Sequence, residues 1–172
     1  MLEGEKVILK PLTDFNEKLF RCRSDPLVTR TLASPYKTRS RERFAERIKM
    51  NGDTRKFFEI IDKNTRETVG AIQIHNINYR AGRAKIGYRI CREYRDRGYA
   101  TEAIRLIVKY SFDTLNLHLL YAEVKEPNAI SARALMKNGF KLVGRIPDYT
   151  IVPGYGRVAL LIFALSRSRL RI

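Results

Sequence analysis

The feature that most constrains the fold is the stretch "AKIGYRICREYRDRGYATEAIRLIVKYSF", residues 84–112. Its first part alternates apolar and polar residues, which predicts a β-strand, and apolar residues at helical spacing over 99–115 predict an amphipathic helix packed on a sheet. A strand that enters a helix through a tight turn directs free N–H groups and the positive end of the helix dipole at one point, so we expect an anion-binding site. Gly98 lets the backbone approach the anion, and Arg95 and Arg97 add positive charge.

The rest of the chain alternates predicted strands and helices. Strands are predicted at 5–12, in a hairpin over 55–77, and at 118–126, 140–146 and 157–165. Helices are predicted at 14–26, between Asp14 and Pro26, and at 39–51 and 128–137. This order of elements predicts an α/β fold, with a mixed sheet and helices on both of its faces.

A chain of 172 residues without a Pro-, Gly- or Ser-rich linker predicts one domain, 1–172. No window holds about 18 consecutive apolar residues, so we expect a cytoplasmic protein without a membrane partner. Cys22 and Cys91 are far apart in the sequence and form no Cys-x-x-Cys pair. We therefore expect buried, reduced thiols and neither a disulfide nor a metal site.

The charge of the chain is strongly unbalanced. Lys and Arg total 34 against 18 Asp and Glu, which gives a formal net charge of +16. Such a surface favours an acidic partner: a nucleic acid, a ribosome, an acidic protein surface or a phosphate-rich cofactor. Ion-pair networks of thermophilic proteins also enrich charged residues, but they predict balanced signs. The basic segments "KTRSRERFAERIK" and "SRSRLRI" keep open a second class of protein, a non-catalytic RNA- or ribosome-binding module.

Motifs narrow the kind of phosphate carrier. Neither G-x-x-x-x-G-K-[ST] nor G-x-G-x-x-G occurs, which argues against nucleoside triphosphates and dinucleotides. The motif present is Arg95-x-x-Gly98-x-Ala100, and in its strand–turn–helix context the chain resembles the GNAT acetyltransferases. The segment "EVKEPNAISARALMKNGFKLVGR" is similar to the family's fifth strand and fourth helix, and "LKPLTDFNEKLFRCRSDPLVTRTL" is similar to its RimJ/RimL branch.

The resemblance implies a fold, a cofactor and a binding site. The implied GNAT fold has a mixed, mostly antiparallel sheet of about six to seven strands, with the fourth and fifth strands splayed around acetyl-CoA. The acetyl group would pass directly to an amine and leave CoA as the product. The implied cofactor-binding residues are the Arg89 and Ile90 main chain, the loop residues Arg95, Asp96, Arg97, Gly98, Tyr99, Ala100 and Thr101, and then Asn128, Ser131, Arg133 and Lys137. For Arg133 and Lys137, a solvated helix face is an equal alternative.

The resemblance also implies catalytic roles. A backbone N–H near Ile90 would stabilise the oxyanion. Glu123 stands at the position of the proposed general base, although it could instead be an outward carboxylate paired with a cation. Leu135 stands where relatives have a tyrosine as general acid, so the thiolate would be protonated by Ser131, by water or by no group at all.

Three further residues bear on the chemistry. Lys85 replaces a glutamate of the RimJ/RimL pattern, so no carboxylate base stands at that position. His75, on the preceding strand, is either a base or a packing residue. Cys91 is expected to be a bystander, since the implied mechanism has no covalent enzyme intermediate.

The acceptor follows from the resemblance and from charge. We expect a protein N-terminal α-amine, such as that of a ribosomal protein. Near pH 7 an α-amine is roughly a tenth neutral, whereas a lysine amine is neutral in about one in two thousand molecules. Small-molecule amines remain the alternative: a polyamine, an aminoglycoside or an amino-sugar. A polycation should avoid a +16 protein whose sequence has no acidic cluster. A homodimer is also left open.

Overall fold

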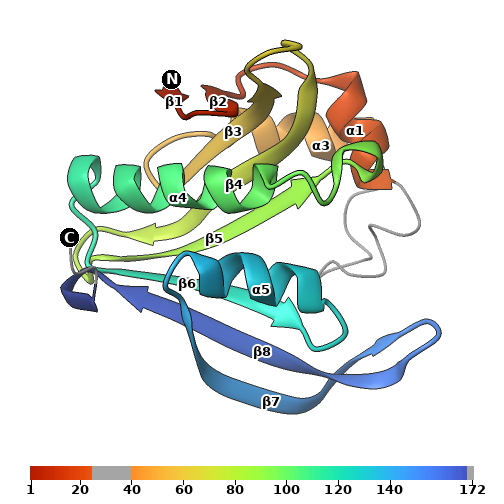
Figure 1. The fold of residues 1–172 in the computed structure, drawn as a ribbon, viewed down its shortest axis with the longest axis vertical. Coiled ribbons are helices and arrows are strands. Elements are labelled where there is room, and N and C mark those ends of the chain that lie inside the picture. Colours follow the sequence, from red (N-terminus) through yellow and green to blue (C-terminus); the bar gives the residue numbers. More distant parts are fainter. Residues whose placement is uncertain (25–39, 170–172) are drawn as a thin grey trace.

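One eight-stranded sheet, with strand order β1-β2-β3-β4-β5-β6-β8-β7, runs through the protein (Figure 1). The computed structural model describes residues 1–24 and 40–169. The strands are β1 (Leu2–Glu3), β2 (Val7–Pro11), β3 (Arg55–Asp62), β4 (Thr68–Asn78), β5 (Arg83–Ile90), β6 (Leu119–Lys125), β7 (Lys141–Val152) and β8 (Gly156–Ser166). The strand beyond the predicted six to seven is β1, because two residues leave no alternating pattern in the sequence. All neighbouring strands are antiparallel except β5 and β6, which are parallel.

The predicted helices are present, with small differences at their ends. They are α1 (Glu17–Ser24), α3 (Arg41–Lys49), α4 (Tyr99–Lys109), which a π-helical turn (Tyr110–Thr114) extends, and α5 (Ala129–Lys137). Short 3₁₀ turns follow β5 (Arg92–Tyr94) and β8 (Arg167–Arg169). The predicted start of α1 at Asp14 is wrong, because Asn16 Oδ1 caps the helix by accepting the Leu19 N–H at 3.0 Å. The predicted stop at Pro26 lies outside the described residues.

Each face of the sheet carries its own apolar cluster. On one face α4 and α5 pack over the larger cluster, to which α4 contributes Ile104 and Ile107. On the opposite face α1 and α3 place Leu19 and Phe44 against Phe57 of β3. Figure 1 shows α4 and α5 in front of the sheet and α1 and α3 behind it. The prediction of helices on both faces is therefore confirmed.

A disulfide joins two segments that are far apart in the sequence. Cys22 in α1 is bonded to Cys91 directly after β5, and their Cα atoms are 5.2 Å apart, a normal separation for such a bond. The prediction of reduced thiols is therefore wrong. The sequence hides the pairing because 69 positions separate the two residues, whereas α1 folds back over the end of β5.

Candidate active site

The predicted anion-binding turn lies between the end of β5 and the start of α4. Gly98 caps α4 with φ +85°, a left-handed conformation that glycine adopts without steric cost. Among the described residues, a Cβ placed at Gly98 would come within 4 Å only of Lys6 Nζ, at 3.7 Å, so the main chain is open there. The N–H groups of the first helical turn have no carbonyl partner within the helix, and the helix dipole favours an anion beside them. This geometry fits a pyrophosphate.

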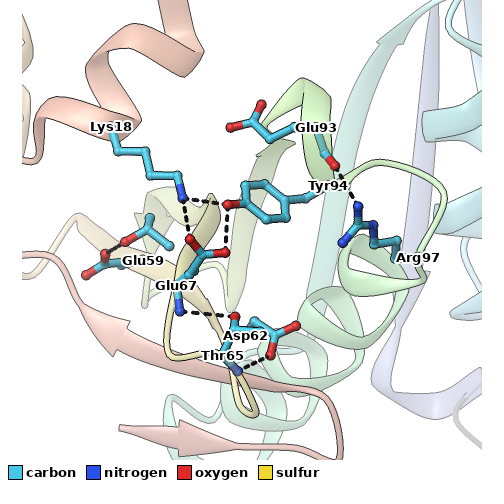
Figure 2. A network of polar contacts seen from close by, with 9 residues as sticks. Lys18, Glu59, Asp62, Thr65, Glu67, Glu93, Tyr94 and Arg97 are labelled. Carbon is cyan, nitrogen blue, oxygen red and sulfur yellow. Dashed lines mark hydrogen bonds and ion pairs between the residues drawn. The ribbon is translucent and has the colours of Figure 1, made fainter.

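Polar contacts anchor this turn to the neighbouring elements (Figure 2). The Tyr94 hydroxyl donates to Glu67 Oε2 at 2.9 Å and accepts from Lys18 Nζ at 2.7 Å. Arg97 donates to the Glu93 carbonyl at 3.0 Å, and its guanidinium lies 5.6 Å from the centre of the Tyr94 ring. The turn is thus held by α1 on one side and by the β3–β4 connection on the other, so its N–H groups are fixed in place before a ligand binds.

A second anchor begins inside the predicted loop. The buried Tyr99 hydroxyl donates a short hydrogen bond to Asp62 at the end of β3. Asp62 Oδ1 also accepts the Thr65 N–H at 2.9 Å, which closes the β3–β4 turn. The Tyr99 side chain is therefore committed to holding the loop. Arg95 is half-buried and Asp96 is exposed, and their contacts with a cofactor stay predictions.

Sequence reasoning missed Lys6, which lies beside Gly98. Glu102, only 6% exposed, accepts the Lys6 N–H at 3.0 Å and so ties the N-terminal segment to the first turn of α4. This contact places the Lys6 ammonium next to the open side of the turn. A cation far away in the sequence thereby joins the residues of the predicted anion-binding turn, and no local motif indicates it.

A gap opens between β5 and β6 beside this turn. The two strands pair only from Arg83 opposite Leu119 to Lys85 opposite Tyr121, and they diverge beyond that point (Figure 1). Residues 86–90 of β5 therefore have no strand partner on this side within the described part of the chain. The predicted splay of the two central strands is confirmed.

Alternation along β5 decides which N–H groups face the gap. The Cys91 N–H donates to the Val69 carbonyl of β4 at 2.9 Å, and successive N–H groups of a strand point to opposite edges. The Ile90 N–H consequently points into the gap, where the oxyanion donor was predicted. By the same alternation the Arg89 main chain faces β4, while its side chain lies near Arg23 of α1 and Arg47 of α3.

Asn128 and Ser131 lie at the start of α5, across the gap from β5. Asn128 Oδ1 caps the helix by accepting the Ser131 N–H at 3.2 Å. The Ser131 hydroxyl lies 2.7 Å from the hydroxyl of Tyr88, a β5 residue that sequence reasoning missed. Burial raises the pKa of Tyr88 to about 12, so this hydroxyl is protonated near neutral pH. Leu135, at the position of the missing tyrosine, is fully buried.

Arg133 and Lys137 are both exposed on α5. The end of α5 is fixed against α4, because Asn138 Nδ2 donates to the Thr101 carbonyl at 3.0 Å. This contact brings the two cations to the same side of the molecule as the anion-binding turn. Their predicted contact with a phosphate stays a prediction, and so does the alternative of a solvated face.

The candidate bases lie on the opposite face of the sheet from Tyr88. Glu123 of β6 forms an ion pair with Lys85 of β5 at 2.5 Å, and both side chains are largely buried, with 23% and 18% of their surface exposed. His75 of β4 stands opposite Lys85. Burial first, and then the charges of Lys85 and Arg55, lower the pKa of His75 to about 4. His75 is therefore neutral at pH 7.

Further features complete the description of this region. A cavity of about 560 Å³ opens beside the disulfide, lined by residues that include Lys18 and Arg92. The described residues contain no group of three or more His, Cys, Asp or Glu side chains that could hold a metal ion. Among the helices of residues 1–24 and 40–169, none is long and apolar enough to cross a membrane.

A splayed sheet beside an open turn that fits a pyrophosphate is the arrangement expected of a CoA-dependent acyltransferase, and comparisons with known proteins agree with this class. The family model of the acetyltransferase (GNAT) domain matches residues 6–141 of this chain. The uncharacterized N-acetyltransferase YoaA of Bacillus subtilis (strain 168) is 32% identical over 158 residues, which are 87% of each chain. Spermidine N(1)-acetyltransferase of Escherichia coli (strain K12) is 32% identical over 94 residues, 55% of this chain and 50% of that protein.

The fold has close counterparts among solved structures. Spermidine N-acetyltransferase from Vibrio cholerae, solved with CoA and spermine, superposes with a TM-score of 0.82 over 96% of this chain and 98% of that one, at 20% identity. The chain belongs to the GNAT family and is an N-acetyltransferase that uses acetyl-CoA. The alternative of a non-catalytic basic module is thereby set aside.

Proposed function

We propose that this protein transfers the acetyl group of acetyl-CoA directly to a protein N-terminal α-amine, as a single-domain member of the RimJ/RimL-like branch. When bound, acetyl-CoA supplies an acetyl thioester with CoA as the leaving group. The chain offers no cysteine nucleophile beside the gap, because Cys91 is bonded to Cys22. This pairing supports direct transfer without an acyl-enzyme.

The residues around the gap fit the cofactor. The turn from Arg95 to Thr101 would hold the pyrophosphate with its N–H groups, assisted by the Lys6 ammonium. Asn128 would bond the pantetheine arm through its side-chain amide, since only its Oδ1 is committed to the helix cap. Arg133 and Lys137 would meet the 3′-phosphate. Free backbone groups along the open edge of β5 suit an extended ligand, as they do at other sheet edges.

The Ile90 N–H would bind the acetyl carbonyl oxygen as negative charge develops on it. A donor of this kind, fixed before the reaction, typically contributes about 3 kcal/mol to transition-state stabilisation. Ile90 is the last residue of β5 and is followed by the disulfide-bonded Cys91. The disulfide therefore fixes the strand end that carries this donor.

The observation that carries the choice of an α-amine is the state of the two candidate bases. Lys85 Nζ forms an ion pair with Glu123 Oε2 at 2.5 Å, so this carboxylate already has a partner. The pKa of His75, about 4, makes its imidazole a weak base. A site without a strong base suits an amine that is already partly neutral. An α-amine, with a pKa of about 8, meets this condition near pH 7, whereas a lysine or polyamine amine, with a pKa of about 10, does not.

Ser131 would donate a proton to the departing sulfur and take one from the Tyr88 hydroxyl, and water would return to Tyr88 the proton that the acetylated amine releases. The Tyr88 hydroxyl is 2.7 Å from Ser131 Oγ and is protonated near neutral pH. This pair would take the place of the tyrosine that Leu135 replaces. A strand residue thus supplies the hydroxyl that the helix lacks.

A small polyamine is the second candidate acceptor, because the Escherichia coli relative that is 32% identical over 94 residues is named a spermidine acetyltransferase. The test is release of CoA thiol from acetyl-CoA with three acceptors: a peptide with a free N-terminus and no lysine, the same peptide N-acetylated but carrying one lysine, and spermidine. We expect turnover on the first peptide only. Equal or faster turnover on the other two would overturn the choice of an α-amine.

A further inference from the structure

Four arginines gather on the face of the sheet that carries α1 and α3. They are Arg23 of α1, Arg47 of α3, Arg55 of β3 and Arg89 of β5, and we call them the arginine cluster. Burial, and then the charges of Arg23 and Arg47, lower the pKa of Arg89 to about 9. Burial, and then the charges of Arg47 and Arg55, lower the pKa of Arg23 to about 10. All four remain charged at pH 7, so their charges repel one another across a partly dry space.

The cluster lies over the middle of β5, next to the point of transfer. Arg47 Nη2 donates to Gln73 Oε1 at 3.3 Å. A Cβ placed at Gly87 would lie 3.3 Å from Gln73 Nε2 and 3.7 Å from His75 Nε2, so both side chains cross above this glycine. Gly87 lies between Lys85, which pairs with Glu123, and Arg89, which precedes Ile90. The arginines therefore share one face with the candidate bases.

Several guanidinium donors of the cluster have no acceptor within residues 1–24 and 40–169. Nε and Nη1 of Arg89 and Nε of Arg47 are buried and without a hydrogen-bond partner. No carboxylate of the described residues forms an ion pair with Arg47, Arg55 or Arg89. Buried charges and buried donors without partners are costly, so proteins rarely keep them without a use. The fork of guanidinium donors matches a carboxylate or a phosphate.

We propose that the arginine cluster binds an anionic group of the acceptor, so that the preferred substrate is a primary amine with a carboxylate or phosphate close to the amine. This inference rests on the proposed function and narrows it. Arg89 and Ile90 are adjacent in β5, and a strand rises about 3.3 Å per residue. The anion site would therefore lie close to the reacting amine, within reach of an acidic first or second residue of a peptide. Spermidine, a polycation, would be repelled.

Binding of product analogues tests the inference without relying on turnover. Isothermal titration of the full chain in the presence of CoA would compare N-acetyl-aspartate amide with N-acetyl-asparagine amide, which differ by one negative charge. N-acetyl-phosphoserine amide tests a phosphate in the same position. Free N-acetyl-aspartate tests a small amino acid as the source of the anion, because its main-chain carboxylate is not blocked.

We expect the aspartate amide to bind at least tenfold more tightly than the asparagine amide. Arg47→Gln should remove most of this preference, and Arg89→Gln should do the same if it folds. Arg43→Gln is the matched control, since this exposed residue of the same helix also removes one positive charge. Equal affinity for the two amides, or an equal loss of preference in the Arg43 and Arg47 variants, would overturn the inference.

Turnover separates this inference from the proposed function. Acetyl transfer from acetyl-CoA would be measured on peptides that start with Asp, Asn or Lys and are otherwise identical. Faster reaction of the Asp peptide, mainly through a lower KM that rises in Arg47→Gln, supports both. Reaction of the Asn or Lys peptide at the same or higher kcat/KM sinks the inference but keeps the proposed function. An intact charge preference in binding without turnover of any peptide refutes the proposed function and keeps the anion site.

Discussion

Replacement of Gly98 by alanine should separate the cost to folding from the cost to cofactor binding. At φ +85° an alanine costs about 1 kcal/mol of stability. No described atom other than Lys6 Nζ lies within 4 Å of the new Cβ, so packing adds little. In a chain of this size, 1 kcal/mol lowers Tm by about 2–4 °C. The same Cβ would occupy the open side of the turn where the pyrophosphate should approach, and we expect acetyl-CoA to bind at least tenfold more weakly.

The assay is thermal unfolding with and without acetyl-CoA. At a concentration of about 100 times Kd the cofactor should stabilise the wild type by about 2.7 kcal/mol, and a tenfold weaker Kd should leave about 1.4 kcal/mol. Gly154→Ala is the matched control, because Gly154 has φ +86° in the β7–β8 turn and no described atom within 4 Å of the new Cβ. Both variants should lose similar stability, and only Gly98→Ala should lose cofactor stabilisation. Equal cofactor stabilisation of the two variants would refute the assignment of the turn.

Three more predictions follow from side-chain contacts. Tyr88→Phe should lower kcat about tenfold, and adding it to Ser131→Ala should cost little more in steady-state kinetics, because the two hydroxyls form one chain. The lowered pKa of His75 means that the unfolded chain binds more protons than the folded chain between pH 6.5 and about 4. The free energy of unfolding should therefore decrease as the pH is lowered across this window, and it should decrease less in His75→Gln. Cys22→Ser should cost about 4 kcal/mol by chain entropy, because the bond spans 69 positions, and a reducing agent should lower Tm in the wild type alone.

The local part of the site could be predicted from the sequence. The strand, the turn and the start of α4 are consecutive, so alternation, Gly98 and helical spacing together indicate an anion-binding turn before any fold is known. The helix that starts at Asn128 was predicted from the local pattern too, whereas the role of Asn128 in cofactor binding is implied only by the family resemblance.

Contacts between distant segments could not be predicted. The sequence shows Tyr88 as one more residue of an alternating strand, and only the fold brings its hydroxyl to Ser131. The sequence marks Lys85 as the replacement of a glutamate and Glu123 as a candidate base, yet their ion pair depends on the parallel register of β5 and β6. The net charge indicated an acidic partner but not a place for it, because the arginine cluster draws on α1, α3, β3 and β5 together.

The two faces of β5 suggest how one strand could contact both acetyl-CoA and the acceptor amine. Its even-numbered residues turn their side chains toward α4 and α5, where Tyr88 meets Ser131, and their N–H groups point into the gap. Its odd-numbered residues turn toward α1 and α3, where Lys85 meets Glu123 and Arg89 lies near Arg47. Because a strand alternates with a period of two, a cofactor in the gap and an acceptor on the α1 and α3 side of the sheet, where we propose them, would meet at Ile90 without sharing side chains. Substitutions at Arg89 should therefore alter the acceptor KM, and those at Tyr88 should alter kcat.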